Sequence, residues 1–392
     1  MQPLEGFRVL DLTHVLAGPC ATHHLRCLGA EVIKIERPGS GDPMRALTMQ
    51  PEHGGLPPGF RALNAGKKSV VVDLSAPEGR AAVLRLAEGV DVFVENFRPG
   101  VARRLGLGPE DLRAVRPDIV YCSISGWGQS GPNSGYGAYD HVIQAATGMM
   151  TLQGSQANDA PVKVGFPIVD IATGISAAEA ILAALIRRLR GDTSPITLDV
   201  SMVDSALALM SGPAAMTLAT GRAPERVGNR GFVGSPGAET FATMDGHISV
   251  AANTMGQFVT LCRLLERPEL AAPPFVPAGL ASGDFLANVA NEPLRVELKQ
   301  AFASADAAEL DLALNAAGVP AAKVRDLSEY LRDIYPATPG IGMNGEPVAL
   351  GPAFRWQEGQ RPALPPAPRL GADTHSVLPA VSNHPRRDAS SS

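Results

Sequence analysis

Residues 7–35, FRVLDLTHVLAGPCATHHLRCLGAEVIKI, contain two short apolar runs that are separated by a helical segment. Residues 7–12 and 31–35 are predicted strands, residues 17–28 are a predicted helix, and Gly29 ends that helix. Two strands that are joined through one helix pair in parallel, so this stretch predicts a βαβ unit.

The same alternation continues downstream. Further strands are predicted at residues 69–74, 90–94, 119–124 and 196–200, and further helices at 75–88, 109–115, 171–190 and 202–220. Ser75 is the expected N-cap of the helix 75–88, because Pro77 and Glu78 suit its first turn. The pattern predicts an α/β fold with an open, Rossmann-like parallel sheet. Ligands bind such sheets beyond the carboxyl ends of the strands, so we expect the chemistry in the loops after Leu12, Ile35, Val94 and Ile124.

A second, smaller unit is predicted after residue 220. Residues 221–237 are rich in Gly, Pro and Arg, residues 241–251 predict a strand pair that turns at Asp245-Gly246, and helical segments run to residue 317. We expect the following division: a large α/β domain (1–205), a linker helix and loop (206–235), a small α+β domain (236–320), a return segment that completes the large domain (321–378) and a disordered tail (379–392).

Composition excludes several classes of partner. Of 392 residues 45% are hydrophobic and 19% charged, and the net charge is -5, which gives no basis for binding nucleic acid or an anionic membrane. No run approaches the roughly 18 apolar residues of a membrane span, and the N-terminal residues do not predict a secretory leader. The four scattered cysteines fit buried thiols of a reducing compartment. We therefore expect a cytoplasmic protein without membrane or nucleic-acid partners.

Common cofactor motifs are absent. The loop after the first strand, residues 13–19, carries no G-x-G-x-x-G, so a nicotinamide or flavin cofactor is not expected. The adjacent His23 and His24 diverge by about 100° on a helix and cannot share one metal ion. No metal site is expected.

Three loops combine Gly or Pro with basic residues, namely residues 36–42, 64–69 and 95–104. Guanidinium and ammonium groups bind phosphate by charge and hydrogen bonds. Any one of these loops alone fits a solvated turn. Together at one sheet edge they predict a site for a phosphorylated ligand that contains adenine, with Phe97 as a stacking surface.

Asp170 follows an extended apolar run and enters the first turn of a long predicted helix. One interpretation is a structural N-cap. The other is a covalent nucleophile that the helix N-terminus keeps ionised, with nearby backbone N–H groups to accept negative charge and Gly174 to let a thioester approach. The residues alone leave both open.

The chain resembles the class III CoA-transferases, which include formyl-CoA:oxalate and carnitine CoA-transferases and are related to α-methylacyl-CoA racemase. The resemblance extends from residue 6 to about residue 378. Its matches are residues 9–19, 28–37, 94–100, 123–128, Tyr139-Asp140 with Gln144, Asp170, 199–204, 318–320 and 370–375.

The resemblance implies a CoA-transferase that moves coenzyme A from an acyl-CoA donor to a small carboxylic acid, through an anhydride and a thioester on Asp170. It implies coenzyme A contacts at Arg37, Lys67, Lys68, Asn96, Phe97 and Arg104, with residues 71–74 near the nucleotide. An acyl pocket is expected at Leu16, Tyr139 and Gly234. The resemblance further implies an interlocked homodimer and a large domain built from N- and C-terminal segments.

Two departures from the formyl-CoA:oxalate enzymes argue against oxalate as the acceptor. Those enzymes carry Gln where this chain has Leu16, and their glycine-rich loop is reduced here to residues 233–237. Succinyl-CoA or another short acyl-CoA is the expected donor. Two alternatives remain: a racemase or epimerase that uses His141 with Asp170 as acid and base, and an acyl-CoA-binding protein without turnover.

Overall fold

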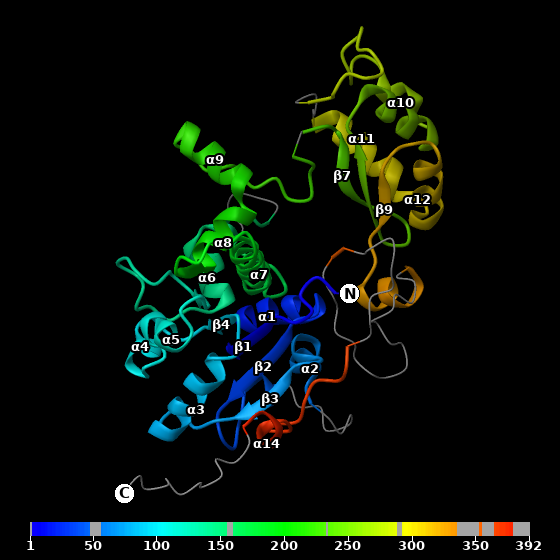
Figure 1. Cartoon of the computed structure of the whole chain (residues 1–392). Helices are drawn as coiled ribbons and strands as arrows, with labels where there is room; N and C mark the ends of the chain where they lie inside the picture. The colour runs from blue at the N-terminus through cyan, green and yellow to red at the C-terminus, as the bar shows by residue number, and fades with distance from the viewer. Residues whose placement is uncertain are drawn as a thin grey trace, which may run out of the picture. The chain divides into compact units, whose positions relative to one another are not determined.

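The computed structural model describes residues 2–47, 56–154, 160–232, 234–287, 292–334, 353–354 and 364–378. The chain divides into two compact units. The first comprises Met1–Met150, Lys163–Ala223 and Ala337–Ser392, and the second comprises Thr151–Val162 and Pro224–Pro336. Figure 1 shows the elements of both, and each unit is described by itself.

The first unit contains a six-stranded parallel sheet in the order β3-β2-β1-β4-β5-β6. Its strands are β1 (Arg8–Leu12), β2 (Glu31–Glu36), β3 (Lys68–Val71), β4 (Val92–Glu95), β5 (Val120–Ser125) and β6 (Ile196–Ser201). This is the Rossmann strand order, so the predicted fold class is confirmed.

Helices cover both faces of this sheet (Figure 1). They are α1 (Ala17–Cys27) and α7 (Ile168–Leu189) on one face, and α3 (Pro77–Ala87) and α5 (Pro109–Val115) on the other. Successive strand residues point to opposite faces. Accordingly, Val9 belongs to the buried cluster with Ile181 of α7, whereas Leu10 belongs to the cluster with Val83 of α3. By length and composition α7 could cross a membrane, but here it packs against α1, β5 and β6.

Shorter helices complete the first unit: α2 (Pro58–Asn64), α4 (Val101–Arg104), α6 (Asp140–Ala146), α8 (Met202–Leu209), α9 (Ser211–Thr220) and α14 (Thr374–Val377). The predicted helix 202–220 is therefore two helices, bent by 83° between α8 and α9. No residue of α9 is buried, and Leu218 is 87% exposed. Such an apolar surface is of the kind that subunit contacts cover, although the interlocked dimer stays a prediction.

The C-terminal segment returns to the first unit, as predicted. Asp373 accepts a hydrogen bond from the backbone N–H of Ser69 at 2.9 Å and donates its own N–H to the Ser69 carbonyl at 2.9 Å. Thr374 Oγ1 accepts from the Val71 N–H at 3.0 Å. These bonds occupy backbone groups of β3, which is one of the two edge strands of the sheet.

The second unit is a small α+β unit. Its antiparallel sheet has the order β7-β8-β9, with β7 (Gly237–Ala242), β8 (His247–Ala252) and β9 (Ala321–Lys323). The hairpin β7–β8 turns through Asp245-Gly246, as predicted. Helices α10 (Met255–Leu264), α11 (Glu292–Ala303) and α12 (Ala307–Ala316) pack on this sheet around a core that contains Phe241, Phe258 and Phe302.

Two predictions need correction. Residues 321–336 belong to the second unit because β9 pairs with β8, so the return segment does not begin at residue 321, and the first unit extends to Ala223. Ser75 is not a helix cap, because α3 begins only at Pro77 and the Ser75 hydroxyl donates to Asp73 instead. The predicted tail, residues 379–392, lies outside the described residues.

Candidate active site

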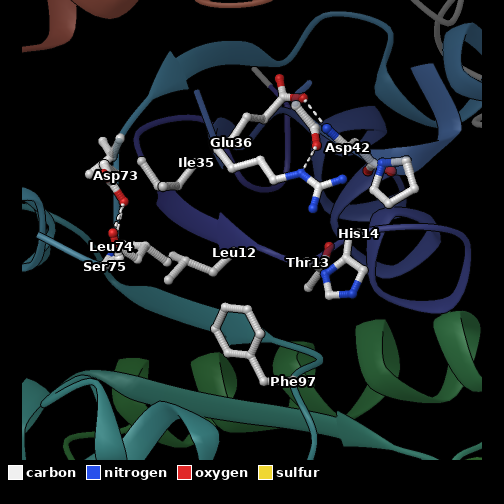
Figure 2. A pocket seen from close by; sticks show the side chains of 14 residues that line it. Leu12, Thr13, His14, Ile35, Glu36, Asp42, Asp73, Leu74, Ser75 and Phe97 are labelled. Atoms are coloured by element: carbon white, nitrogen blue, oxygen red, sulfur yellow. Dashed lines mark hydrogen bonds between the residues drawn. The ribbon is translucent and has the colours of Figure 1, made fainter. Parts of the chain in front are cut away.

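A pocket of about 330 Å³ lies beyond the carboxyl ends of β1, β2, β3 and β4 (Figure 2). It is lined by residues 12–14, 35–37, 41–43 and 72–75 and by Phe97. The loops after Leu12, Ile35 and Val94 therefore meet where the strand order predicted, whereas the loop after Ile124 does not line the pocket. The segment 72–75, which follows β3, forms the remaining wall.

The pocket combines an apolar surface with polar groups. The rings of Phe97 and His14 lie 6.1 Å apart between their centroids and face the cavity (Figure 2). Glu95 holds Phe97 in place by accepting its backbone N–H at 2.7 Å. Burial lowers the pKa of His14, so its imidazole is neutral at pH 7. Arg37 is exposed at the rim and donates one N–H to the Gly41 carbonyl at 3.1 Å.

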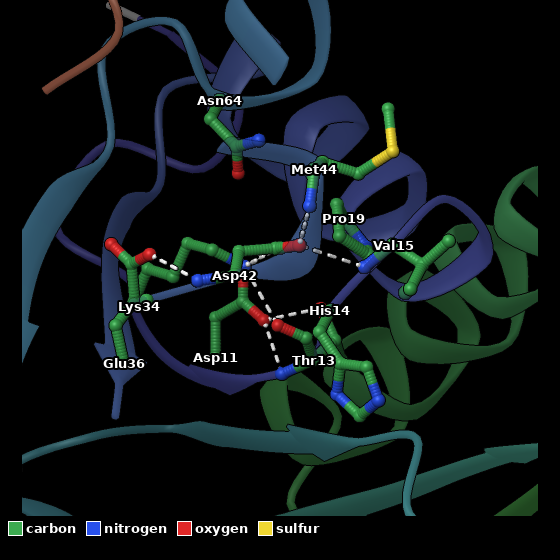
Figure 3. Close-up of polar contacts among 12 residues, drawn as sticks. Asp11, Thr13, His14, Val15, Pro19, Lys34, Glu36, Asp42, Met44 and Asn64 are labelled. Atoms are coloured by element: carbon green, nitrogen blue, oxygen red, sulfur yellow. Dashed lines mark hydrogen bonds and ion pairs between the residues drawn. The ribbon is translucent and has the colours of Figure 1, made fainter. Parts of the chain in front are cut away.

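The loop between β1 and α1 is held in a strained conformation (Figure 3). Val15 has a φ of 70°, which is rare for a β-branched residue. Asp42 accepts the Val15 N–H at 3.2 Å, and Asn96 both accepts from the His14 N–H at 3.0 Å and donates to its carbonyl at 2.8 Å. Lys34, which is buried, forms an ion pair with Asp42 at 2.9 Å. Polar contacts thus fix the backbone that lines the pocket.

A second buried ion pair joins Lys67 to Asp11 at 3.2 Å. The Lys67 ammonium also donates to the Thr22 hydroxyl at 2.8 Å and to the Pro19 carbonyl at 3.0 Å. Burial lowers the pKa of Lys67 to about 8, although Asp11 opposes that shift. These contacts bind Lys67 to β1 through Asp11 and to α1 through Pro19 and Thr22, so its ammonium has partners within the protein interior.

The residues that we expected to contact coenzyme A therefore do not all lie at the pocket. Arg37 and Phe97 line the pocket, and Asn96 supports it through His14. Lys67 and Lys68 do not line it, because Lys67 precedes β3 and Lys68 is the first residue of β3, whereas the pocket lies at the other end of that strand. Lys68 pairs with Glu31 at 2.6 Å. Arg104 is exposed at the end of α4 and is not a lining residue.

Asp170 is the third residue of α7 and is partly buried. It is not the N-cap of this helix, since that position is Pro167. Asp140, at the start of α6, accepts the backbone N–H groups of Val169 at 2.7 Å and Asp170 at 3.1 Å with one carboxylate oxygen. Asp140 therefore provides the helix cap, and the Asp170 carboxylate is not needed for it.

Two expectations about Asp170 are wrong. The first-turn N–H groups are already engaged, because Asp140 accepts two of them and the Ile171 N–H donates to the Pro167 carbonyl at 3.1 Å, so none is left to stabilise an oxyanion. The helix N-terminus also does not lower the pKa of the carboxyl. Burial, and then the Asp140 charge, raise the pKa of Asp170 to about 7.

Gly174 serves helix packing rather than ligand access, contrary to expectation. A Cβ atom at this position would lie 2.6 Å from Cβ of Cys20 and 2.8 Å from the Ala17 carbonyl oxygen. The glycine therefore lets α1 approach α7 closely. Asp170 lies one turn before Gly174 on the same face of α7, and Ala17 follows the pocket loop directly. The first turn of α1 thus connects the pocket to the helix that carries Asp170.

The residues expected around an acyl group lie in both units. Leu16 precedes α1, and Tyr139 is 68% exposed immediately before α6. Gly234 belongs to the second unit. His141, the residue that the racemase alternative requires, is exposed and stacks on Tyr139 with 6.4 Å between ring centroids. The residue of this segment that reaches α7 is Asp140.

Comparisons with known proteins identify the family. Residues 4–374 match the family described as CoA-transferase family III. The chain belongs to this family. The resemblance noted in the sequence is thereby confirmed, and the protein is a CoA-transferase rather than a binding protein without turnover.

Relatives of this CoA-transferase act on several acids. The chain is 34% identical over 391 residues to succinyl-CoA:glutarate CoA-transferase of Mus musculus, which covers 97% of this chain and 87% of the relative. It is 36% identical over 379 residues to acetyl-CoA:oxalate CoA-transferase of Acetobacter aceti, covering 94% of each. A crystal structure of a CAIB/BAIF family protein from Brucella suis superposes with a TM-score of 0.83 at 31% identity, covering 96% of this chain and 98% of that chain.

Sequence reasoning missed the buried residues that hold the pocket loops and the start of α7 in place. Asp140 and Gln144 were noted only as matches to the transferases, and the roles of Lys34 and Asp42 were not seen. The available signal was Lys34, a lysine with apolar neighbours on both sides within a strand, since a buried lysine needs a charged partner. Among the residues that the structure describes, no group of His, Cys, Asp or Glu could hold a metal ion.

Proposed function

We propose that this enzyme transfers coenzyme A from a short acyl-CoA, such as succinyl-CoA, to a small carboxylic acid through covalent intermediates on Asp170. The names of its relatives support CoA thioesters and small mono- or dicarboxylic acids as the substrate classes. The observation that carries the proposal is that the Asp170 carboxylate is not used to cap α7. Asp140 performs the capping that would otherwise explain an aspartate at this position.

The raised pKa of Asp170 supports a nucleophilic role. A partly buried carboxylate beside a second carboxylate is a stronger base than an exposed one, and it is destabilised until it reacts. A pKa of about 7 leaves the ionised form of Asp170 populated near neutral pH. Attack on a thioester requires that form.

The reaction follows in four balanced steps. The Asp170 carboxylate attacks the donor thioester, the C–S bond breaks, and a mixed anhydride and CoA thiolate form. The thiolate attacks the aspartyl carbonyl and expels the donor acid as a carboxylate, which leaves an aspartyl-CoA thioester. The acceptor carboxylate then displaces the thiolate to form a second anhydride. Finally the thiolate attacks the acceptor acyl carbon and regenerates Asp170. No proton, metal ion or ATP is consumed.

The pocket beyond β1–β4 is the proposed site of the nucleotide end of coenzyme A. Phe97 offers a ring for stacking, Arg37 offers a cation at the rim, and the hydroxyl and carboxylate of Ser75 and Asp73 offer polar contacts. Stacking and charge-assisted hydrogen bonds are the contacts that an adenine and its phosphates use. Because α1 begins just after the pocket loop and packs on α7 at Gly174, we propose that the thioester end of the same molecule extends from the pocket toward Asp170.

Trapping tests the covalent step. We expect that incubation with succinyl-CoA followed by hydroxylamine or borohydride modifies a single peptide, which contains Asp170, as seen by mass spectrometry. The same treatment of Asp306→Asn, which changes an aspartate at the start of α12, should give the same modified peptide. Exchange between acids without any modification of the Asp170 peptide would contradict the proposal. Solvent deuterium entering the α-position without acid exchange would favour the racemase instead.

The pocket is tested by Phe97→Ala. We expect KM for the acyl-CoA donor to rise about tenfold, because a stacked aromatic ring contributes about 1–3 kcal/mol to binding of a base, while kcat changes less than threefold. Phe285→Ala, which removes a ring that is 63% exposed in the second unit, serves as the control and should leave both constants unchanged. Steady-state kinetics with varied donor measures both. Equal KM values for the two variants would place the nucleotide elsewhere.

A further inference from the structure

The first turn of α7 is held by side chains of α6 rather than by its own. Pro167, at the N-cap position, provides no side-chain hydrogen bond. Asp140 is only 9% exposed, and its Oδ2 accepts from Val169 and Asp170, as described above. The backbone of the proposed nucleophile thus hydrogen-bonds directly to a second carboxylate.

Gln144 orients that carboxylate. Its Nε2 donates to Oδ1 of Asp140, which leaves Oδ2 directed at α7. Its Oε1 accepts the backbone N–H of Val164 at 2.9 Å. The Gln144 side chain is completely buried. One turn of α6 therefore holds both ends of the segment 164–170, which leads into Asp170.

We propose that Asp140 and Gln144 are positioning residues for the transfer reaction, which fix the first turn of α7 and place a negative charge beside Asp170. The inference rests on the proposed role of Asp170 as nucleophile. It assigns Asp140 a function that helix capping alone does not require. Asparagine caps helices about as well as aspartate, and it would do so without repelling a neighbouring carboxylate.

The charge of Asp140 has a chemical consequence. With burial as the larger cause, it raises the pKa of Asp170 to about 7. The more basic a carboxylate is, the more readily it donates its electron pair to an acyl carbon, while a pKa near the working pH keeps a large ionised fraction. Asp140 therefore makes the nucleophile more reactive without keeping it protonated.

Few other titratable groups face Asp170. From α1 the neighbour is Cys20, whose own thiol has a pKa raised to about 11 by burial and is neutral near pH 7. Asp204 of α8 is bound by the Ser201 hydroxyl, and Cys122 of β5 is a buried thiol with a raised pKa. His141 of α6 is exposed. On α7 itself, Glu179 is nine residues away, about 13 Å along the axis.

The test compares Asp140→Asn with the wild-type enzyme. Removal of the charge should lower the pKa of Asp170, so the acidic limb of the profile of kcat/KM against pH should move down by about one unit. At pH 8, where Asp170 is ionised in both proteins, kcat should fall on the order of tenfold because the nucleophile is less basic. Gln144→Ala, which frees Asp140 to turn away, should lower kcat with little change in the KM for acyl-CoA.

Asp306→Asn is the matched control. Asp306 caps α12 in the second unit by accepting two backbone N–H groups, those of Ala308 and Glu309, each at 2.9 Å. Both variants should lose a similar, small part of the free energy of unfolding, yet only Asp140→Asn should shift the pH profile. An unshifted acidic limb, with a loss of activity no larger than that of Asp306→Asn, would overturn the inference.

A second measurement is independent of turnover. In protein labelled with 13C at aspartate carboxyl carbons, Asp170 is assigned by its absence from the spectrum of Asp170→Asn. Its titration midpoint should lie about one unit lower in Asp140→Asn than in wild type. If Asp170→Asn retains full exchange activity but this midpoint moves, the proposed function fails while the electrostatic effect of Asp140 on Asp170 stands. An unmoved midpoint overturns the inference itself.

Discussion

Asp170→Asn is expected to lower kcat by at least about 10⁴-fold. An amide oxygen is a far weaker nucleophile than a carboxylate, and loss of a covalent nucleophile removes the whole reaction path rather than one stabilising contact. The substitution preserves shape, and the helix cap remains because Asp140 provides it. Exchange of label between succinate and succinyl-CoA measures the effect.

A measurement of coenzyme A binding by Asp170→Asn distinguishes a chemical role of Asp170 from a structural one. The pocket proposed for the nucleotide lies beyond β1–β4 and does not include residue 170, so the variant should bind coenzyme A within about threefold of wild type by calorimetry. Asp192→Asn, a change in an exposed ion pair that follows α7, should retain full activity. Exchange at a comparable rate in Asp170→Asn would show that this carboxylate carries no acyl group.

Asp11→Asn should give the largest loss of stability, about 3–5 kcal/mol in the free energy of unfolding. Asp11 accepts hydrogen bonds from Thr13 and Thr22 and pairs with Lys67, and all four side chains are buried. The neutral amide would leave the Lys67 ammonium without its counter-charge in the interior, which is the costly way to break a buried pair. Urea titration monitored by circular dichroism measures the change.

Glu31→Gln is the control for that measurement. It breaks the pairs of Glu31 with Lys68, the residue adjacent to Lys67, and with Arg8, but all three side chains are over one third exposed. Exposed pairs contribute about 0–1 kcal/mol, so the loss should stay within that range. Equal losses in the two variants would mean that Asp11 and Lys67 gain nothing from being buried together.

The alternation of strands and helices in the sequence predicted the sheet, because strands that are joined through helices pair in parallel along its whole length. Residues 7–35 contain a complete βαβ unit, and alternate residues such as Val9 and Leu10 contribute to cores on opposite faces. The β9 strand was not predicted because it is three residues long and, within the part of the chain that the structure describes, pairs with one strand that lies more than 60 residues earlier. Local pattern carries no information about such pairing.

Within the site, sequence reasoning located the loops but not the partners of their side chains. Arg37 and Phe97 follow strands and line the pocket, as strand order predicts. Lys67 looks equivalent in the sequence, yet it is buried against Asp11, which is 56 residues away. The apparent cap at Asp170 was ambiguous for the same reason, because the residue that really caps α7 lies 30 residues earlier, on another helix.

The attachment of the C-terminal segment to β3 affects how the chain folds while it is being synthesised. Asp373 pairs with a residue 304 positions earlier, so β3 emerges from the ribosome long before the segment that covers its outer edge. An unpaired edge strand can recruit strands of other chains, and contacts between residues so distant form late. The nascent enzyme therefore passes through a period in which this edge is open, and chains that end before residue 371 would keep it open permanently.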